Sequence, residues 1–221
     1  MKQKSMPTRT VLVTGFEPFG NEAVNPSWQA VKLLQGARLG GHCIQARCLP
    51  VVFGQSLIHL CKAIAETQPA LVLCIGQAGG RSQISLERIA INLDDARTPD
   101  NAGNSPVDAA VVADGPAAYF SSLPIKRLRA ELHRAGIPAE ISHTAGTYVC
   151  NHVFYGLMHA LHRRRGLCGG FVHIPYSPEQ AARHPGAPSL SIETITTALR
   201  IIVRTTLKYP SDIVEAGDAT H

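Results

Sequence analysis

Apolar residues along this chain form short runs and helical stripes that alternate in order. Six segments have the length and pattern of strands: residues 10–14, 42–49, 70–75, 84–92, 139–142 and 170–174. The run at residues 70–75 (ALVLCI) is continuously apolar but too short for a buried helix. Such a run is typical of a central strand in a sheet that is covered on both faces.

Helical spacing of apolar residues fills the intervals between these strands. Residues 25–34 begin with Asn-Pro, an N-cap followed by proline at the first helical position. Four further segments are expected to be helices: residues 56–67, 125–135, 151–162 and 192–203. This alternation predicts an α/β fold, a three-layer α/β/α sandwich with a largely parallel, twisted central sheet.

The chain of 221 residues is expected to form a single domain, with residues 1–8 and 211–221 as flexible ends. It contains no internal repeat, low-complexity tract or linker-like segment. Residues 93–106 (LDDARTPDNAGNSP) form a polar loop of unusual length. Because long loops in compact domains are often functional, this loop is a candidate element of a site.

The composition is that of a globular protein with a sizeable core: 45% of the residues are hydrophobic and 17% are charged. No apolar run approaches the roughly 20 residues that span a bilayer. The basic residues 1–7 lack the apolar region of a secretory signal. The six cysteines form no C-x-x-C pair and are scattered through apolar segments, which favours reduced thiols in a cytoplasmic protein over a disulfide framework.

The net charge of +5 raises the question of a nucleic-acid partner. The only dense basic cluster, residues 163–165, falls at the apparent end of a helix, where cations complement the helix dipole. Aromatic residues make up 5% of the chain and do not interleave with the charges. The sequence therefore favours neither a single-strand stacking platform nor any other nucleic-acid site.

One cysteine stands in a position that suits nucleophilic chemistry. In the segment SHTAGTYVCNH, Cys150 follows a strand and a Gly-containing turn and lies near the start of a helix. Unpaired N–H groups and the helix dipole at such a position can stabilise a thiolate and bind an oxyanion. Most cysteines are small buried hydrophobes instead, and we assign that role to the others: Cys43, Cys48, Cys61, Cys74 and Cys168.

A base and an orienting acid are the further groups that such a cysteine needs. His173 lies near the end of a strand, the edge where open α/β sheets bind ligands, although a lone histidine there is more often structural. His152 would point away from the helix face of Cys150, whereas His143 remains open as an alternative. Glu87 is an acid within an apolar strand pattern. On spacing alone, the preferred interpretation is a carboxylate on an edge strand that pairs with Arg88 or with solvent.

Two loops resemble the walls of a site. Residues 15–20 (GFEPFG) place two aromatic rings directly after the first strand, and residues 76–81 (GQAGGR) follow the central strand. The second loop could bring backbone amides close to a ligand, but it matches neither of the common nucleotide-binding glycine motifs. Ordinary turn chemistry explains both loops equally well.

Five stretches in the same order resemble the pyroglutamyl peptidase I family, also called pyrrolidone-carboxylate peptidases, from about Val11 to about Val203. They are VLVTGFEPFG with NPSW, IGQAGGRSQISLERIAIN, GPAAYF with LPIKR, HTAGTYVCNHVFYGLMH, and GGFVHIPYSPEQ with APSLS. The resemblance implies a catalytic triad of Cys150, His173 and Glu87. It also implies a substrate pocket that involves Phe16, Phe19, Asn25, Gln77, Arg97, Tyr148 and Val149.

Within that pocket, the resemblance places the two phenylalanines against the faces of the lactam ring and Arg97 close to the active site. Tyr148 stands where phenylalanine is also expected, which changes the polarity of the pocket but not the triad. The family is cytoplasmic, needs no metal or other cofactor and is typically a homotetramer.

The resemblance implies a thiol protease that hydrolyses the N-terminal pyroglutamyl bond of peptides through a thioester acyl-enzyme. A phosphorylase or nucleosidase that uses residues 76–80 for phosphate is the alternative within enzymes. A catalytically silent binding protein is the alternative in another class.

Overall fold

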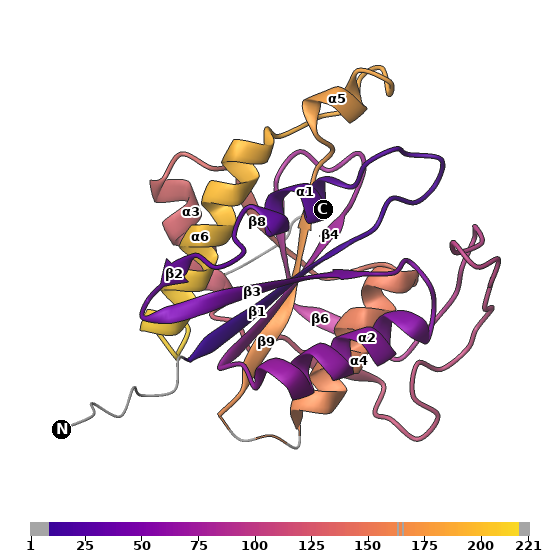
Figure 1. The fold of residues 1–221 in the computed structure, drawn as a ribbon, viewed down its shortest axis with the longest axis horizontal. Coiled ribbons are helices and arrows are strands. Elements are labelled where there is room, and N and C mark those ends of the chain that lie inside the picture. The colour runs from indigo at the N-terminus through magenta and orange to yellow at the C-terminus, as the bar shows by residue number, and fades with distance from the viewer. Residues whose placement is uncertain (1–8, 163, 165, 217–221) are drawn as a thin grey trace.

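The computed structural model describes residues 9–216 except 163 and 165 (Figure 1). Of the ends expected to be flexible, residues 1–8 and 217–221 lie outside the described residues, as do two members of the arginine cluster at 163–165. Residues 211–216 are described, and Asp212 Oδ2 accepts from Lys126 N at 3.0 Å. No helix among the described residues is both long enough and apolar enough to cross a bilayer.

A seven-stranded sheet forms the centre of the molecule, with the strand order β2-β3-β1-β4-β9-β5-β8. Its strands are β1 (Thr10–Phe16), β2 (Arg38–Leu39), β3 (His42–Leu49), β4 (Leu71–Gln77), β5 (Ile84–Glu87), β8 (Ala139–Ser142) and β9 (Cys168–Ile174). The neighbours from β3 through β1 and β4 to β9 are parallel, and β5 is parallel to β8. Only the β2–β3 and β5–β9 pairs are antiparallel, so the expected largely parallel sheet is confirmed.

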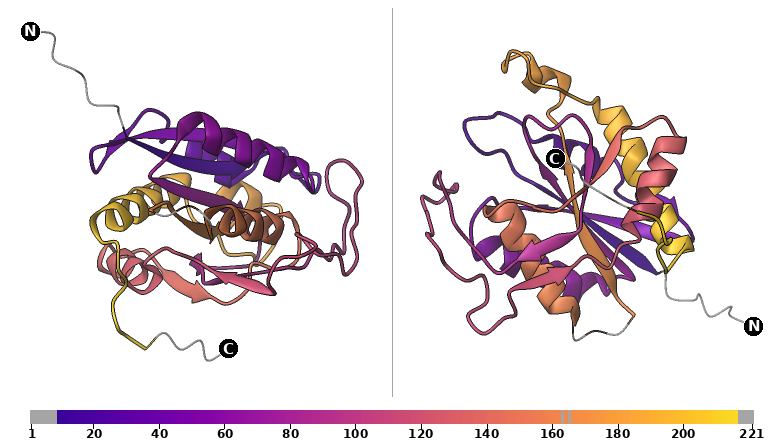
Figure 2. Two further views of the ribbon diagram at one scale, coloured as in Figure 1. Left: turned by 90° about the horizontal axis from the view of Figure 1, so that it is seen from below. Right: turned by 180° about the vertical axis from the view of Figure 1, so that it is seen from behind.

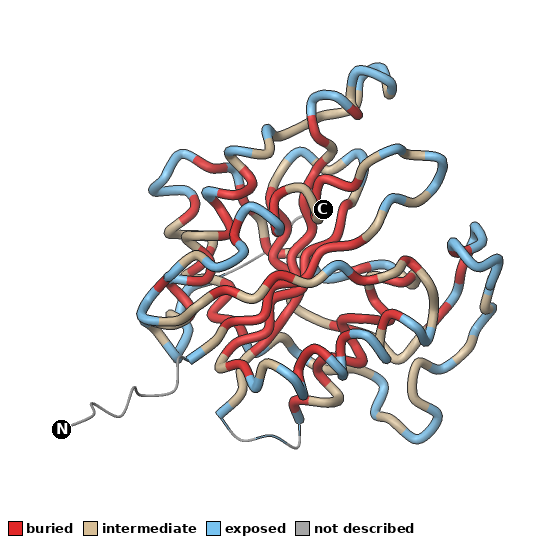
Figure 3. Tube along the Cα trace, viewed as in Figure 1, coloured by how far each residue is buried: buried red, intermediate tan, exposed pale blue. Residues whose placement is uncertain are grey.

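Helices cover both faces of this sheet (Figures 1 and 2). One face carries α1 (Pro26–Lys32), α3 (Ile125–Arg134) and α6 (Ile192–Lys208), and the other carries α2 (Gln55–Thr67) and α4 (Val149–His162). Each face has its own apolar core, and the central strands are buried along most of their length (Figure 3). The α/β/α sandwich that the alternation predicts is therefore the observed fold.

The structure differs from the sequence-based prediction at residues 84–92, which were expected to form one strand. The segment breaks at Arg88, whose N–H donates to Ser142 O at 2.8 Å and whose carbonyl accepts from Ser121 N at 2.8 Å. The chain then leaves the main sheet, and β6 (Ile89–Ile91) pairs with β7 (Ala118–Phe120) in a separate two-stranded sheet. Besides β2 and β7, the short helix α5 (Pro178–Ala181) was also not predicted.

The connection from β1 to α1 is held rigidly by backbone packing and a capping residue. Asn25 Oδ1 accepts from Ser27 N at 3.0 Å, and Pro26 occupies the first turn, as the sequence predicted. A Cβ atom added to Gly15 would lie 2.7 Å from Trp28 N, so the end of β1 and the start of α1 touch backbone to backbone. This contact sets the course of the loop that carries Phe19.

Candidate active site

Cys150 lies in the first turn of α4 with its Sγ over the end of β4. A Cβ atom added to Gly76 would lie 2.8 Å from that sulfur, so only glycine leaves room for it. Gly76 is the register partner of His173 on the neighbouring strand β9. Since paired residues on parallel strands lie about 4.8 Å apart and face the same side, Cys150 and His173 meet over adjacent strands.

His173 is bound to a buried acid. Its Nδ1 lies 2.7 Å from Glu87 Oε1, and the two side chains are 4% and 0% exposed. Glu87 ends β5, the strand that runs antiparallel to β9. A hydrogen on Nδ1 leaves the lone pair of Nε2 available to act as a base.

Arg81 is a second partner of the same carboxylate, and sequence reasoning did not place it in the site. Its Nη1 lies 2.7 Å from Glu87 Oε1, and its Nη2 donates to Thr144 O at 3.0 Å. Burial and then the negative charge of Glu87 raise the pKa of the Cys150 thiol to about 12, while Arg81 lowers it. A helix N-terminus is expected to lower the pKa of a thiol, whereas the pKa of Cys150 is raised. Desolvation of the buried sulfur outweighs the effect of the helix.

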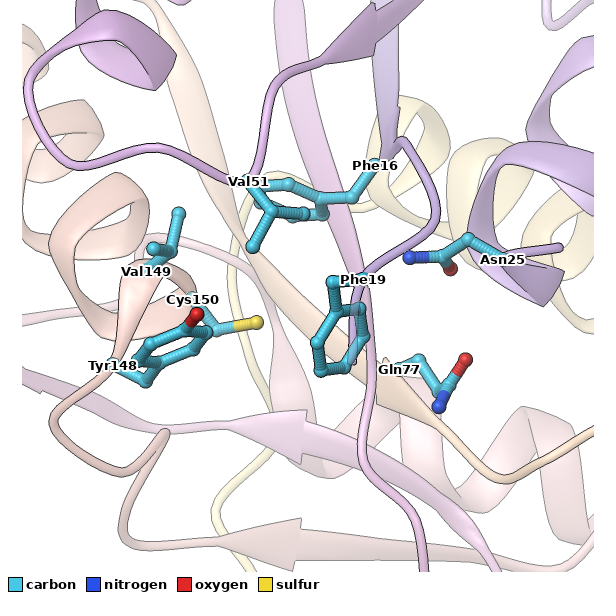
Figure 4. A pocket seen from close by; sticks show the side chains of 8 residues that line it. All are labelled: Phe16, Phe19, Asn25, Val51, Gln77, Tyr148, Val149 and Cys150. Carbon is cyan, nitrogen blue, oxygen red and sulfur yellow. The ribbon is translucent and has the colours of Figure 1, made fainter. Parts of the chain in front are cut away.

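A small pocket opens beside Cys150 (Figure 4). Its lining residues come from the ends of β1 and β4, the loops that follow β1 and β3, and the start of α4: Phe16, Phe19, Asn25, Val51, Gln77, Tyr148, Val149 and Cys150. The pocket encloses about 240 Å³ of space, including part that is open to solvent. The part of this space that the centre of a water-sized sphere can reach is only about 20 Å³. Because one ordered water needs about 10–15 Å³ by the same measure, the pocket suits only a small group.

Three aromatic rings, those of Phe16, Phe19 and Tyr148, form part of the pocket wall. The ring centroids of Phe19 and Tyr148 lie 6.5 Å apart, and Phe16 is 2% exposed with its ring packed 6.3 Å from that of Phe171. Figure 4 shows the Cys150 sulfur directed into the space between these rings. A flat apolar group in this space would therefore lie against ring faces and close to the thiol.

The two amide side chains of the pocket differ in how their polar atoms are used. Asn25 Oδ1 accepts from Ser27, and its Nδ2 donates to Glu17 O at 2.9 Å, so this residue mainly fixes the loop after β1. Gln77 Oε1 accepts from Gln180 Nε2 at 3.1 Å. Because the fully buried Gln180 holds that oxygen, the NH2 group of Gln77 is the atom left for a ligand.

The long loop at residues 93–106 is tied to the pocket from outside. Asp95 N donates to Thr147 O at 2.9 Å, and the Tyr148 hydroxyl donates to Pro99 O at 3.0 Å. Phe53 N donates to Asp100 Oδ2 at 2.9 Å. Arg97 lies between the first two attachments but is exposed and does not line the pocket.

The competing histidines have other positions. His152 is buried, with Nδ1 2.7 Å from Asp94 Oδ2 and Nε2 accepting from Gly54 N at 3.0 Å, so both ring nitrogens are engaged. His143 is exposed in the loop that follows β8. Only His173 combines a buried acid partner with a place on the sheet face beside Cys150 among the described histidines.

Two of the three glycines in residues 76–80 are explained by packing. Besides the contact of Gly76 with Cys150, a Cβ atom on Gly79 would overlap the ring of Tyr176. Gly80 has a φ of +88° and open space around it, which is ordinary turn chemistry. The described residues also contain no cluster of three or more His, Cys, Asp or Glu side chains that could hold a metal ion.

The sequence-based interpretation missed several residues that shape this site. Arg81 and Gln180 contact the proposed acid and the pocket amide, Val51 lines the pocket, and Asp94 and Asn151 hold the surrounding loops. Gln180 was visible only as the fourth residue of SPEQ, a capping pattern whose local role it also fills. Arg81, Asp94 and Asn151 lie in segments that the sequence had marked as candidate parts of a site, but their individual partners are distant in sequence and left no local signal.

Comparison with known proteins gives consistent matches over nearly the whole chain. A sequence model described as pyroglutamyl peptidase matches residues 9–209. The pyrrolidone-carboxylate peptidase of Escherichia fergusonii is 56% identical over 213 residues, covering 96% of this chain and 100% of that protein. The pyroglutamyl peptidase I structure from Bacillus amyloliquefaciens has 52% identity and a TM-score of 0.92, covering 95% of this chain and 100% of that one. The pyrrolidone carboxyl peptidase of Thermococcus litoralis has 36% identity and a TM-score of 0.91, with the same coverage.

Proposed function

The chain belongs to the pyroglutamyl peptidase family, and we propose that Cys150, His173 and Glu87 carry out its reaction, hydrolysis of an N-terminal pyroglutamyl bond. The observation that carries this assignment is the sulfur of Cys150 over Gly76, beside a histidine whose Nδ1 lies 2.7 Å from a buried glutamate. The same sulfur points into a small pocket that Phe16, Phe19 and Tyr148 help to line.

The first step forms a carbon–sulfur bond. Because the Cys150 thiol has a raised pKa, its proton must leave during the attack, and His173 Nε2 accepts it. The sulfur adds to the pyroglutamyl carbonyl carbon, and the free N–H groups in the first turn of α4 bind the resulting oxyanion. The Glu87 carboxylate holds the imidazole orientation and stabilises the imidazolium.

The second step breaks the peptide bond. The imidazolium of His173 returns its proton to the departing amine, which leaves a thioester between Cys150 and the pyroglutamyl group. Water then gives a proton to His173 and adds to the thioester carbon. Collapse of this intermediate releases pyroglutamate, and the thiol regains its proton.

Substrate selection follows from the chemistry of the lactam ring, which has two apolar faces, one N–H donor and one C=O acceptor. Phe16, Phe19 and Tyr148 supply apolar walls for the faces, and Val149 completes the wall at the start of α4. The NH2 group of Gln77, oriented by Gln180, can donate to the lactam carbonyl. A prolyl group has no such carbonyl and would leave this donor unpaired, which lowers its affinity.

Arg97 is proposed to act at the edge of the site, where the loop at 93–106 is attached on either side of it to residues 147 and 148. An exposed cation at that place suits the peptide that follows the pyroglutamyl group. We further infer a cytoplasmic homotetramer that acts on peptides, without a metal, nucleic acid or membrane partner. The cytoplasmic assignment is supported by six cysteines that are all unpaired.

The decisive measurement is hydrolysis of a pyroglutamyl aminocoumarin amide by the wild type and by Cys150→Ala, with the prolyl amide as control. The proposal expects the wild type to cleave only the pyroglutamyl amide and the variant to lose cleavage. Equal cleavage by the Cys150→Ala variant would remove the assignment of the nucleophile. No cleavage by folded, reduced wild type would favour a silent binding protein.

The phosphorylase or nucleosidase alternative is not favoured. It would use the glycine-rich segment at residues 76–80 as a phosphate cradle, but two of those glycines make room for Cys150 and Tyr176. It would also leave the reactive position of Cys150 without a purpose.

A further inference from the structure

The proposed acid of the site shares one oxygen between two cation-forming partners. Glu87 Oε1 lies 2.7 Å from both His173 Nδ1 and Arg81 Nη1. The other oxygen, Oε2, is buried and has no hydrogen-bond partner among the described residues. The carboxylate is 0% exposed, so these two contacts at Oε1 are its side-chain partners among the described residues.

Arg81 also reaches the segment that leads to the nucleophile. Its Nη2 donates to Thr144 O at 3.0 Å, in the loop between β8 and α4. The same guanidinium therefore joins the end of β5 to the approach to Cys150. Its side chain is 26% exposed, so part of the guanidinium keeps contact with water while the pair it serves is buried.

The charge of Arg81 has a predictable effect on a buried acid–histidine pair. Glu87 with neutral His173 carries one negative charge, and the two groups exchange protons as a pair. A guanidinium stays charged at all relevant pH values. With its Nη1 2.7 Å from Glu87 Oε1, Arg81 balances the charge of an ionised acid beside a neutral imidazole.

We propose that Arg81 is a positioning residue that keeps the Glu87–His173 pair ready to accept the Cys150 proton at neutral pH and holds the loop before Cys150 in place. This inference rests on the roles proposed above for the three residues. Other titratable groups near this cluster are Cys74 on β4, Cys150 on α4, Tyr148 directly before α4 and Glu140 on β8, which contacts Ser85 at 2.6 Å. Arg88, the neighbour of Glu87 in sequence, is a second guanidinium, and its buried Nε and Nη2 have no partner among the described residues. Arg81 is the cation that contacts the Glu87 carboxylate directly.

The test compares the pH profile of kcat/KM for the pyroglutamyl amide in the wild type, Arg81→Met and Arg81→Lys. Removal of the cation should move the acid limb upward by about one to two pH units and lower kcat/KM at neutral pH about tenfold or more. Lysine should restore the limb because it restores the charge. Its kcat should stay a few-fold low, because one ammonium cannot reproduce the two contacts of the guanidinium fork.

Arg38→Met is the matched control, since it removes an exposed arginine from the edge strand β2. Its profile should match that of the wild type and so exclude a general effect of net charge. Arg81→Gln, which keeps a donor but no charge, is a second neutral variant in case the methionine variant does not fold by circular dichroism. A fall in rate without a shift of the acid limb in the neutral variants would overturn the proposal and leave Arg81 a purely structural role.

A second readout needs no substrate. The rate of Cys150 alkylation by iodoacetamide, followed on its peptide by mass spectrometry, should move to higher pH in Arg81→Met because Arg81 lowers the pKa of this thiol. The exposed Cys61 in the same sample is the internal reference and should not change. If the wild type cleaves nothing but the alkylation profile of Cys150 still differs between the wild type and Arg81→Met, the role of Arg81 is supported although the proposed function fails. Identical profiles in the two proteins would count against the role of Arg81.

Discussion

The structure contains two buried acid–histidine pairs with nearly the same local geometry, one with its histidine on β9 and one with its histidine on α4. Glu87 pairs with His173 through a 2.7 Å contact at Nδ1, and Asp94 pairs with His152 through a 2.7 Å contact at Nδ1. All four side chains are at most 7% exposed. The contact between acid and imidazole therefore cannot by itself separate a proposed catalytic pair from a structural one.

The difference lies in the remaining atoms. His152 uses Nε2 to accept from Gly54 N, so it fastens the loop before α2 to α4 and has no nitrogen left for a reaction. His173 has its place beside Cys150 over the neighbouring strand. The acids differ as well, because Glu87 has Arg81 as a second partner and Asp94 Oδ1 has none among the described residues. The two pairs therefore differ in the further contacts of the histidine and the acid, not in the contact between them.

The same substitution in both histidines should separate the pairs most clearly. His173→Ala should lower kcat by about 10³-fold or more because the base is lost, while Glu87 keeps Arg81 and the fold is little affected. His152→Ala should keep kcat within about tenfold but lower the free energy of unfolding by about 3 kcal/mol, because Asp94 stays buried without a partner. Hydrolysis assays and urea denaturation measure the two effects. The opposite assignment would follow if His152→Ala were the variant without activity.

Removal of the acid charges should give the next largest contrast. Glu87→Gln should lower kcat by about 10²-fold, because an amide neither stabilises the imidazolium nor fixes its tautomer as a carboxylate does. Asp94→Asn should change kcat less than about threefold and cost about 1–2 kcal/mol of unfolding free energy. Parallel steady-state kinetics and denaturation of both variants test this. Equal losses of kcat would mean that the two pairs act together.

Acid conditions should act on the loop that carries Asp94 through a third carboxylate. Burial tends to raise the pKa of Asp100, but hydrogen bonds from Asn104, Phe53 and Ala102 lower it overall. The stability it contributes is therefore present above the ordinary aspartate pKa of about 3.9 and is lost as the pH falls through the lower folded value.

Asp100→Asn should accordingly lower the unfolding free energy by about 1–2 kcal/mol at pH 7, since charged acceptors make the stronger hydrogen bonds. The difference from the wild type should begin to shrink below about pH 4, where the unfolded chain takes up a proton at Asp100, and should vanish once the pH is below the lowered pKa of the folded state. Urea denaturation at both pH values is the measurement. A difference that stays constant with pH would show that the charge of Asp100 contributes nothing.

The smallest effect is expected at the pocket wall. Tyr148→Phe removes the hydroxyl that donates to Pro99 O at 3.0 Å and so releases one attachment of the loop at 93–106. KM for the pyroglutamyl amide should change less than about threefold, with kcat unchanged and a stability loss of about 1 kcal/mol or less. A large fall in kcat would instead mean that the Tyr148 hydroxyl takes part in the reaction. Tyr148 would then belong with the proposed triad and not only with the pocket wall.

Much of the architecture was predictable from local patterns. The apolar runs at residues 42–49 and 139–142 coincide with β3 and β8, and the Asn-Pro start of α1 caps as expected. The pattern failed at residues 84–92, where a continuous strand-like alternation hides the break at Arg88. Alternation reports burial on one side of a chain, but it does not report which sheet the next residue joins.

For the candidate site, the sequence by itself determined a cysteine at a helix start, a histidine near the end of a strand and aromatic residues after β1. Residue spacing left the acid and the base open, and only the resemblance to a family selected Glu87 and His173. The tertiary structure alone decided that Glu87 meets His173 across an antiparallel strand pair and that Arg81 shares its oxygen. The reason is physical: periodicity is a property of neighbouring residues, whereas a contact across 86 residues depends on strand direction and register, which are set by packing of the whole sheet.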